Sequence, residues 1–456
     1  MNRRCSMVAL LAAVFGSQLA FAGDTEFRVA TFRVDITIPL GHRCMGVLPT
    51  KSSKIVDPLE ARGFVLLGLK HPVVIVALDW CEVRNDSYDQ WRRALAVAAG
   101  TSSNHVLLSS NHQHDAPVVD AGAARLLAGV GLADELFDDA FHGRTLLRVT
   151  QGVKAAIQRA QPVTHIGLGQ AKVERVASSR RVVDSDGKVR YHRGSRSGIT
   201  EFFRNAPEGV IDPFLKTISF WNGDTPILAI HSYATHPMSH YGQGGVSWDF
   251  VGIARDRRQK DDPKVFQIYA SGCSGDVTAG KYNNGSAAHR TALADRLYQA
   301  MLQSWQSTKK HPLKNSSLRI SKVDFEFHGS PELGAGALTK QLHDKKQTVE
   351  SRIHAAMSLA SRERVAAGRG IEVPCLDLGQ AQILLLPGES FVAYQLRAQK
   401  LRPDSFVMAI GYGECWPGYI PTDADFRAGF SDKWLWVAPG SEAKLLQAMS
   451  EALGNR

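Results

Sequence analysis

Short apolar runs rich in valine, isoleucine and leucine recur along the chain and predict buried strands. These runs cover residues 64–69, 73–78, 105–109, 227–232, 265–270, 381–386 and 406–410. Longer stretches with helical spacing of apolar residues lie between or after them, at residues 135–159, 287–305, 337–367, 389–401 and 441–453. This alternation predicts an α/β fold, a multi-layer sandwich of largely buried mixed sheets with flanking helices.

Glycine and proline clusters follow several of the predicted strands, at residues 111–117, 271–280, 387–388 and 417–418. In open α/β sheets, ligands bind in the crevice beyond the carboxyl ends of the strands. We therefore expect the chemistry of this protein in these segments. The polar stretch 184–198 is different, because Asp186-Gly187 is a turn signal that predicts an exposed loop or hairpin.

The N-terminus has the features of an export signal. Arg3 and Arg4 precede an apolar run at residues 7–15, and Ala20-Phe21-Ala22 is a small-x-small cleavage pattern. The run is too short for a stable bilayer anchor. We expect residues 1–22 to be removed and residues 23–456 to form a single domain in the periplasm or outside the cell. An uncleaved membrane tether is the alternative.

Composition and charge indicate which kinds of molecule this protein could bind. A chain of 456 residues with 44% hydrophobic and 21% charged residues predicts a globular body. Removing Arg3 and Arg4 lowers the formal charge from +10 to +8, spread without an aromatic-interleaved basic patch, which argues against nucleic acid. A weak attraction to anionic lipid surfaces, and so a peripheral membrane contact, is compatible with this charge. The sequence gives no oligomeric state.

Five cysteines follow the signal segment, and none forms a Cys-x-x-Cys motif. An exported protein could pair some of them, but the odd count leaves at least one thiol free. The sequence leaves open whether the chain forms one disulfide or keeps five buried thiols. The cysteines are Cys44, Cys81, Cys273, Cys375 and Cys415.

The sharpest local pattern is His112-Gln113-His114, directly after the strand predicted at 105–109. Side chains alternate along an extended backbone, so both imidazoles point to one side. This geometry suits a metal ligand beside a second histidine that acts on the substrate. A structural or fortuitous pair remains the alternative, because His-x-His alone is a weak motif.

Three further residues follow predicted strands and carry metal-ligand chemistry. His236 lies beyond the strand at 227–232; the alternative is a histidine bonded to a backbone carbonyl, and we expect neither His231 nor His240 to be a ligand. Glu389 begins a predicted helix after Pro387-Gly388, where the helix dipole alone favours a carboxylate. Tyr419 follows Gly418, and its alternative is a buried turn tyrosine.

A glycine-rich segment, residues 271–278, follows another predicted strand and includes Gly275, Asp276 and Thr278. Such loops expose backbone N–H groups that can hold an oxyanion or a polar group of a substrate. The segment lacks the Gly-Lys-Ser/Thr ending of a phosphate loop, and the chain lacks Gly-x-Ser-x-Gly. For Asp276, as for Asp249, the alternative is support of a loop by side-chain to backbone hydrogen bonds.

In their order along the chain, these segments resemble the neutral/alkaline non-lysosomal ceramidase family. The resemblance runs from about Phe32 to Phe430 and includes His112-Gln113-His114, where the family has a His-Thr-His-Ser-Gly-Pro type motif. Each motif is short, and their order and spacing make the match specific. The other matching segments are 32–37, 45–46, 179–181 with 186–187, 234–237, 247–249, 275–278, 387–389 and 418–422.

The resemblance implies one catalytic zinc and hydrolysis of the amide bond of ceramide. His112, His236, Glu389 and Tyr419 would be its ligands, a set of borderline and hard donors that leaves a position open for water. Zinc lowers the pKa of bound water to about 7. By the same resemblance, His114 would orient the substrate or stabilise the tetrahedral intermediate, and Arg180 would stabilise charge near the metal.

The chain also departs from the family pattern. Thr278 replaces a serine once proposed as nucleophile, which favours a zinc-water mechanism over an acyl-enzyme, and Asp115 replaces the serine after the His-x-His. Phe430 falls near a family tyrosine and lacks its hydroxyl. We expect the immunoglobulin-like C-terminal domain of the family to be lacking.

These residues favour an exported zinc hydrolase that cleaves an amide bond of an N-acyl lipid with zinc-activated water. Phe430 and the expected lack of the terminal domain favour an alternative, a non-lipid amide or ester as substrate on the same scaffold. A third hypothesis is a non-catalytic binding protein on a decayed enzyme fold, to which Thr278 and Phe430 point.

Overall fold

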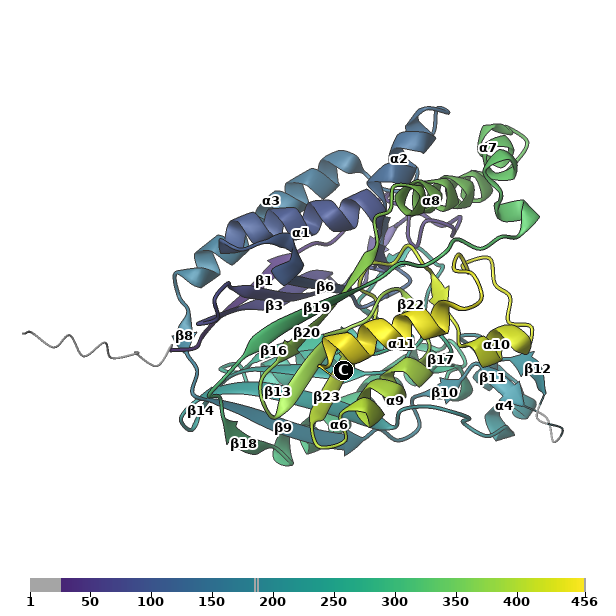
Figure 1. Cartoon of the computed structure of the whole chain (residues 1–456). Helices are drawn as coiled ribbons and strands as arrows, with labels where there is room; N and C mark the ends of the chain where they lie inside the picture. Colours follow the sequence, from purple (N-terminus) through teal and green to yellow (C-terminus); the bar gives the residue numbers. More distant parts are fainter. Residues whose placement is uncertain (1–25, 184–185, 187, 455–456) are drawn as a thin grey trace, which may run out of the picture.

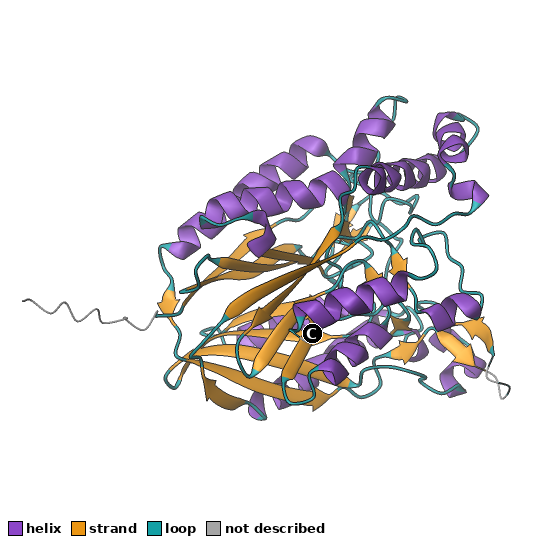
Figure 2. Cartoon of the chain, viewed as in Figure 1, coloured by secondary structure: helices purple, strands orange, loops and turns teal. Residues whose placement is uncertain are grey.

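A computed structural model describes residues 26–183, 186 and 188–454 (Figure 1). The expected signal segment, residues 1–22, lies outside these residues. Figure 2 shows helices along the outside and strands within, in several layers. This confirms the predicted α/β sandwich with buried mixed sheets and flanking helices.

The first sheet is covered by two long helices, α1 (Asn85–Ala99) and α3 (Asp139–Ile157). Its strand β4 consists of six buried aliphatic residues, as expected for a strand covered on both faces. Strands β4 and β6 are parallel, and the other neighbours pair antiparallel. The strand order is β6 (Val106–Ser110), β4 (Val73–Leu78), β3 (Glu60–Leu67), β1 (Arg28–Asp35) and β8 (Gln161–Pro162).

The second sheet is covered by α5 (Asp249–Asp261) and α6 (Ala287–Gln306). Only β14 and β16 are parallel within it. The Ser286 hydroxyl accepts the backbone N–H of His289 and so caps the start of α6. The strand order is β16 (Phe266–Ser271), β14 (Thr225–Tyr233), β13 (Phe214–Asn222), β9 (His165–Lys172) and β18 (Lys309–Pro312).

The third sheet packs against α9 (Val392–Leu401) and α11 (Ser441–Ala452). Strands β21 and β23 are parallel, and the remaining pairs are antiparallel. The strand order is β19 (Ser317–Val323), β20 (Ile371–Asp377), β21 (Ala381–Leu385) and β23 (Phe406–Ile410).

The remaining elements lie outside the three sheets and their covering helices. Three of them, α2, α7 and α8, lie together at one end of the molecule in Figure 1, and the others are short. The helices among them are α2 (Ala121–Ala128), α4 (Glu201–Asn205), α7 (Ala335–His343), α8 (Val349–Ala366), α10 (Asp423–Arg427), η1 (Ser103–His105), η2 (Ser197–Ile199), η3 (Gly280–Tyr282) and η4 (Pro331–Leu333). The strands among them are β2 (Lys54–Ile55), β5 (Glu82–Val83), β7 (Val118–Val119), β10 (Ser178–Ser179), β11 (Arg181–Val183), β12 (Val189–His192), β15 (Gly245–Val246), β17 (Val277–Thr278), β22 (Glu389–Ser390) and β24 (Tyr419–Ile420).

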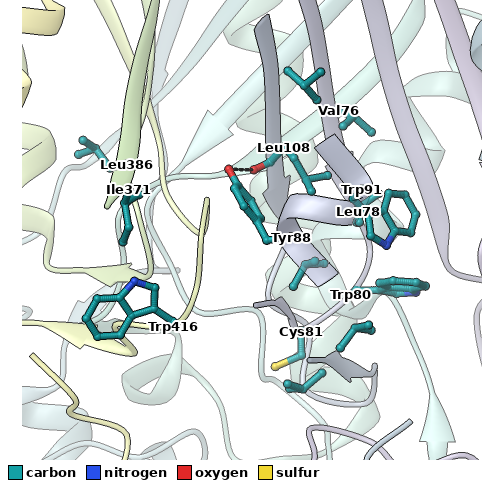
Figure 3. Close-up of a cluster of buried hydrophobic side chains, with 14 of the residues drawn as sticks. Val76, Leu78, Trp80, Cys81, Tyr88, Trp91, Leu108, Ile371, Leu386 and Trp416 are labelled. Atoms are coloured by element: carbon teal, nitrogen blue, oxygen red, sulfur yellow. Dashed lines mark hydrogen bonds between the residues drawn. The ribbon is translucent and has the colours of Figure 1, made fainter. Parts of the chain in front are cut away.

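One hydrophobic core lies between the three sheets. Ile75 of the first sheet, Ile230 of the second and Ile383 of the third belong to the same buried cluster. A second cluster fills the space between the first sheet and its helices, where Trp80 and Trp91 lie, and extends toward the third sheet, where Trp416 lies (Figure 3). The sheets are therefore fixed relative to one another by apolar packing.

Each of the three sheets contains one parallel pair, and the loops that follow these pairs converge. The pairs are β4/β6, β14/β16 and β21/β23. Hydrogen bonds join the loops directly: Ser271 Oγ donates to the carbonyl of Asn111, and the N–H of Gly411 donates to the carbonyl of Ser271. The carboxyl ends of three different sheets thus meet at one place, as the positions of the glycine and proline clusters led us to expect.

All seven strands predicted from apolar runs are present, with ends that differ by at most four residues from those predicted. The predicted hairpin is also present as β11 and β12, which pair antiparallel around a turn at Asp186, although Gly187 lies outside the described residues. The antiparallel strands β1, β9, β13, β19 and β20 did not stand out as apolar runs, because polar residues alternate along most of them.

Two helix predictions are wrong in part. The single helix predicted at 337–367 is two helices, α7 and α8, because the Asp344 side chain accepts the N–H of Lys346 and the Thr348 side chain caps α8 at Ser351. Glu389 does not begin a helix. It lies in β22, paired with Tyr419, and α9 begins three residues later.

The five cysteines within the described residues are all free and buried, so none of them forms a disulfide. Burial raises the pKa of the thiols, to about 12 for Cys44 and Cys375. Among the described residues, no helix is both long enough and apolar enough to cross a bilayer.

Candidate metal centre

Three side chains from three different sheets meet in the interior. His112 follows β6, His236 follows β14, and Glu389 follows β21. The Nε2 atoms of His112 and His236 lie 3.4 Å and 3.0 Å from Oε2 of Glu389, and the centroids of the two rings are 4.8 Å apart. All three residues are no more than 3% exposed. The structure thus brings together three of the four ligands predicted from sequence.

Both imidazoles are held through their other ring nitrogen. His112 Nδ1 lies 3.0 Å from the carbonyl oxygen of Cys81, and His236 Nδ1 lies 2.7 Å from that of Ser274. A carbonyl oxygen only accepts hydrogen bonds, so each Nδ1 carries the hydrogen and each neutral ring has its lone pair on Nε2. A backbone carbonyl behind the ring is the arrangement that orients metal-binding histidines.

The atoms that face one another lack ordinary partners. His236 Nε2 and Glu389 Oε2 are both buried, and neither has a hydrogen-bond partner. Two acceptors at 3.0 Å repel each other unless a cation or a proton lies between them. Ligand atoms of His112, His236 and Glu389 all lie within 4.8 Å of one another. Two imidazoles and a carboxylate are a donor set that suits zinc, so these residues fit the metal that the resemblance implies.

The electrostatics favour an ionised Glu389 and a neutral His236, the forms that bind a metal, whereas they favour protonation of His112. Burial alone would raise the pKa of Glu389, but His112 and His236 beside it hold that pKa well below its usual range. Burial, with the nearby charge of Arg180, lowers the pKa of His236 to about 4. For His112, the adjacent carboxylates of Glu389 and Glu82 outweigh burial and raise the pKa. At neutral pH the site therefore holds an ionised carboxylate beside a neutral His236.

Tyr419 lies beside Glu389 because β22 and β24 pair in parallel with these two residues in register. Its hydroxyl oxygen accepts a hydrogen bond of 2.6 Å from Nη1 of Arg180. Burial raises the pKa of Tyr419 well above its usual range, and Arg180 opposes this shift. The hydroxyl is fixed next to the carboxylate, which is compatible with the predicted role of Tyr419 as the fourth ligand.

His114 lies against the same cluster without a hydrogen bond of its own. Its ring centroid is 5.1 Å from that of His112 and 5.7 Å from that of His236, and the ring of Tyr241 packs on it at 5.0 Å. Both ring nitrogens are buried and unpartnered. Burial and the two neighbouring histidines lower the pKa of His114 well below 6.5, so it is neutral and free to bond a ligand.

A second set of ligand-type atoms, from Cys81, His112 and His114, also lies within 4.8 Å. Burial, with Glu82 and Glu389 nearby, raises the pKa of Cys81 well above its usual range. A protonated thiol is a poor ligand, and His112 Nδ1 already donates to a carbonyl. The set with His236 and Glu389 is therefore the better metal site.

Arg180 is held by its backbone and points its guanidinium at the cluster. Its N–H donates to the carbonyl of Asp276 and its carbonyl accepts from the N–H of Arg193. Nη1 bonds Tyr419, Nη2 lies 3.5 Å from the sulfur of Met238, and Nε has no partner. The group is a fixed positive charge with an unused donor beside the proposed ligands.

The glycine-rich loop, residues 271–278, packs against the backbone of Glu389 and Ser390. The N–H of Gly275 donates to the carbonyl of Ser390, and a Cβ on Gly275 would lie 2.1 Å from the carbonyl oxygen of Glu389. The Asp276 carboxylate accepts the N–H of Val392, and burial raises its pKa to about 6. These contacts are within the protein, and the substrate contacts expected for both residues stay predictions.

Thr278 lies close to the cluster but faces the backbone. Its hydroxyl oxygen accepts the N–H of Gly280, and its backbone forms a bridge with His236. Phe430, where the family pattern has a tyrosine, packs on Tyr419 with ring centroids 5.8 Å apart. Phe430 therefore lies next to a proposed ligand.

Other histidines near these segments do not join the cluster. His231, inside β14, is bonded through Nδ1 to Thr217 and through Nε2 to Gln267. The sequence analysis missed Tyr412, whose ring stacks on His112. Its flanking glycines in Gly411-Tyr412-Gly413 were the available signal.

No protein-family model and no curated protein matches the sequence. Two solved structures share the fold. Neutral ceramidase from Pseudomonas aeruginosa superimposes with a TM-score of 0.67 at 17% identity, over 94% of this chain and 74% of that chain. A structure described as ceramidase complexed with C2 gives a TM-score of 0.68 at 16% identity, over 94% and 75%. The chain therefore has the fold of the neutral ceramidases, which confirms the resemblance at the level of fold.

Proposed function

We propose that this protein is a zinc-dependent hydrolase that cleaves an amide bond of an N-acyl lipid. The observation that supports this proposal is the pair of unpartnered atoms His236 Nε2 and Glu389 Oε2, with Nε2 of His112 beside them, in a fold shared with neutral ceramidases. A buried carboxylate that faces an imidazole lone pair is stabilised by a cation.

His112, His236, Glu389 and Tyr419 hold the zinc. A zinc ion there would polarise the scissile carbonyl and make water nucleophilic at neutral pH. The chain positions these groups in advance: backbone carbonyls fix both imidazoles, and Arg180 fixes the phenol of Tyr419. Little reorganisation is needed for binding, because each ligand is already in a single orientation.

His114 and Arg180 act on the substrate. His114 is neutral and has two unpartnered ring nitrogens, so it can accept a proton from the attacking water or hydrogen-bond the amide. Arg180 has an unused Nε–H and a permanent positive charge, which stabilises the negative charge that develops on the carbonyl oxygen. Both roles follow from groups that the protein itself leaves unsatisfied.

Exposed apolar residues near the site support a lipid substrate and a peripheral membrane contact. The segment that begins directly after Arg180 presents Tyr191, Ile199 and Phe202 at 48–62% exposure, and the rings of Tyr191 and Phe202 are 4.7 Å apart. Such side chains partition into a membrane interface. Binding to phosphatidylglycerol vesicles, lost in an Ile199→Ser/Phe202→Ser double variant, would support this contact; equal binding would refute it.

Export to the periplasm or beyond is part of the proposal. It rests on Arg3, Arg4 and the small-x-small sequence Ala20-Phe21-Ala22. N-terminal sequencing of protein recovered outside the cytoplasm should begin at Gly23. Recovery of only the uncleaved chain, attached to membranes, would favour the tether instead.

Two measurements test the proposal. The purified protein should contain about one equivalent of zinc, and His112→Ala should lose it. Zinc below half an equivalent that is unchanged in His112→Ala would refute the zinc site. Turnover of a ceramide or another N-acyl lipid should depend on that zinc.

Phe430 favours one alternative, a non-lipid amide or ester on the same scaffold, because the ring beside Tyr419 offers no hydroxyl to a polar lipid headgroup. Turnover of a soluble amide with none of ceramide would support it. Zinc binding without hydrolysis of any substrate across a broad panel would support a binding protein on a decayed enzyme fold.

A further inference from the structure

Tyr412 occupies the centre of the cluster, although it is not one of the proposed ligands. It is fully buried, and its ring stacks on that of His112 with centroids 4.4 Å apart and planes 21° apart. Its ring is also perpendicular to that of His236, at 6.1 Å. A single aromatic side chain therefore contacts both imidazoles.

The hydroxyl of Tyr412 reaches the second histidine through Ser274. It shares a hydrogen bond of 2.7 Å with Ser274 Oγ, and it lies 3.4 Å from Nδ1 of His236. Ser274 is also the residue whose carbonyl accepts the Nδ1–H of His236. Fixing the side chain of Ser274 therefore helps to fix the carbonyl that orients His236.

The backbone of Tyr412 joins the other two loops. Its N–H donates to the carbonyl of Gly388, directly before Glu389, and its carbonyl accepts the N–H of Ser110, two residues before His112. Tyr412 thus bonds the loops that carry each of the three clustered side chains. Such a residue transmits any change in its own position to all three.

The backbone conformation of this pair is unusual. His112 and Tyr412 have φ angles of 65° and 58°, in the left-handed region that disfavours residues with a Cβ. Such a strained residue persists where its surroundings define it fully, typically at functional sites. Packing alone would be satisfied by a residue in a relaxed conformation, so the strain argues for a constraint on the two rings.

We infer that Tyr412 is a positioning residue that fixes His112 and His236 for zinc, through ring stacking on the first and through Ser274 on the second. This inference rests on the proposed zinc site. Tyr412 touches neither substrate nor metal in this role, and it acts by reducing the freedom of the ligands before the metal binds.

Three substitutions separate the two contacts. Tyr412→Phe keeps the stacking and removes the hydroxyl, and Ser274→Ala removes the same hydrogen bond from the other side. Both should raise the dissociation constant for zinc about 10-fold, the lower end of the effect of outer partners of metal-binding histidines. Tyr412→Leu loses both contacts and should raise it about 100-fold.

Tyr88→Phe is the matched control. Tyr88 is also a buried tyrosine with one hydroxyl hydrogen bond, to the carbonyl of Leu108 (Figure 3), and it contacts none of the proposed ligands. Its variant should bind zinc as the unaltered protein does. Circular dichroism of the metal-free variants shows whether each is folded. If Tyr412→Phe does not fold, Ser274→Ala tests the inference in its place.

The measurements are zinc affinity, from competition with a chromophoric chelator, and the visible d–d spectrum after cobalt substitution. A weakened affinity and a shifted cobalt spectrum in Tyr412→Phe, with neither in Tyr88→Phe, support the inference. Equal affinities and spectra in the unaltered protein, Tyr412→Phe and Ser274→Ala overturn it and leave the zinc site intact. An unaltered protein that binds no zinc instead overturns the proposed function itself.

Discussion

The Nε2 atom of His236 lies 3.0 Å from Oε2 of Glu389, and neither atom has a hydrogen-bond partner in the folded protein. On the other side of the ring, the Nδ1–H of His236 donates to the carbonyl of Ser274. A neutral imidazole lone pair and a carboxylate thus face each other away from solvent. This contact is unfavourable without a cation, and it supports the proposed metal site.

Zinc should therefore stabilise the protein strongly. At a free concentration a thousand-fold above the dissociation constant, linkage predicts an increase in the free energy of unfolding of about 4 kcal/mol. Glu389→Gln should abolish this increase, because its amide can donate to His236 Nε2 and its charge is gone. Thermal melts with and without chelator measure both effects.

Glu363→Gln is the control for that substitution, since Glu363 is exposed and, within the described part of the chain, forms an ion pair with exposed Arg125 alone. It should melt as the unaltered protein does with and without zinc. Equal stabilisation of Glu389→Gln by zinc would contradict the assignment of Glu389 as a ligand.

His114→Asn should separate catalysis from metal binding. The site keeps all its proposed ligands, so zinc content should stay at one equivalent, while kcat should fall about 10²- to 10⁴-fold through loss of acid–base catalysis. Steady-state kinetics alongside metal analysis check this. A variant that loses zinc as His112→Ala does would show that His114 is a ligand instead.

Arg180→Lys should lower kcat/KM about 10²- to 10³-fold without loss of zinc. The substitution keeps the charge but removes the fixed guanidinium that bonds Tyr419 and leaves Nε–H free. Retained turnover with a normal zinc content would mean that the guanidinium does not act on the substrate.

Gly275→Ala should weaken the site through the backbone. The added Cβ would meet the carbonyl oxygen of Glu389 at 2.1 Å, so the Glu389 loop must shift. We expect a loss of about 1–3 kcal/mol in the free energy of unfolding, together with weaker zinc binding. Chemical denaturation and chelator competition measure these two quantities.

Gly336→Ala is its control, because a Cβ there has no neighbour within 4 Å and the residue lies in α7. This variant should be as stable as the unaltered protein or slightly more stable. If both alanine variants behave alike, the close approach at Gly275 has no energetic consequence.

Glu414 should make stability depend on pH. Burial raises its pKa to about 7, from an ordinary value of 4.5, although Arg364 opposes the shift. A carboxyl whose pKa is raised by folding favours the folded state while it is protonated. That contribution is complete below pH 4.5 and is lost as the pH rises through 7, at a cost of about 3 kcal/mol by pH 8.

Glu414→Gln should remove this dependence. The amide oxygen can still accept the N–H groups of Asn85 and Trp416, as the carboxylate does now. Urea unfolding at pH 5 and pH 8 should show a smaller difference in the variant than in the unaltered protein. An identical difference would assign the pH dependence to other groups.

Much of the fold could be predicted because buried strands have a local signature. Six consecutive aliphatic residues in β4 are recognisable without any knowledge of their neighbours. The split between α7 and α8 was missed, although Thr348 and Asp344 carry its signal, because the polar segment between them resembles an exposed helix surface.

The sequence predicted which residues could form the site, but not how they lie relative to one another. His112, His236, Glu389 and Tyr419 each follow a strand, and their chemistry identifies them as ligand types. Tyr412 has the same side chain as Tyr419 and also follows a strand, but its role follows from contacts with residues more than a hundred positions away, Ser274 and His112.

The sequence alone predicts which residues could carry the chemistry and which segments are buried strands, because both depend on side-chain type and short-range periodicity. The tertiary structure decided that the ends of three parallel strand pairs, from three sheets, meet at one point. It also decided which nitrogen of each histidine faces Glu389, since backbone carbonyls of Cys81 and Ser274 make that choice. Distances between groups far apart in the chain are set by packing of the sheets, and no local pattern encodes them.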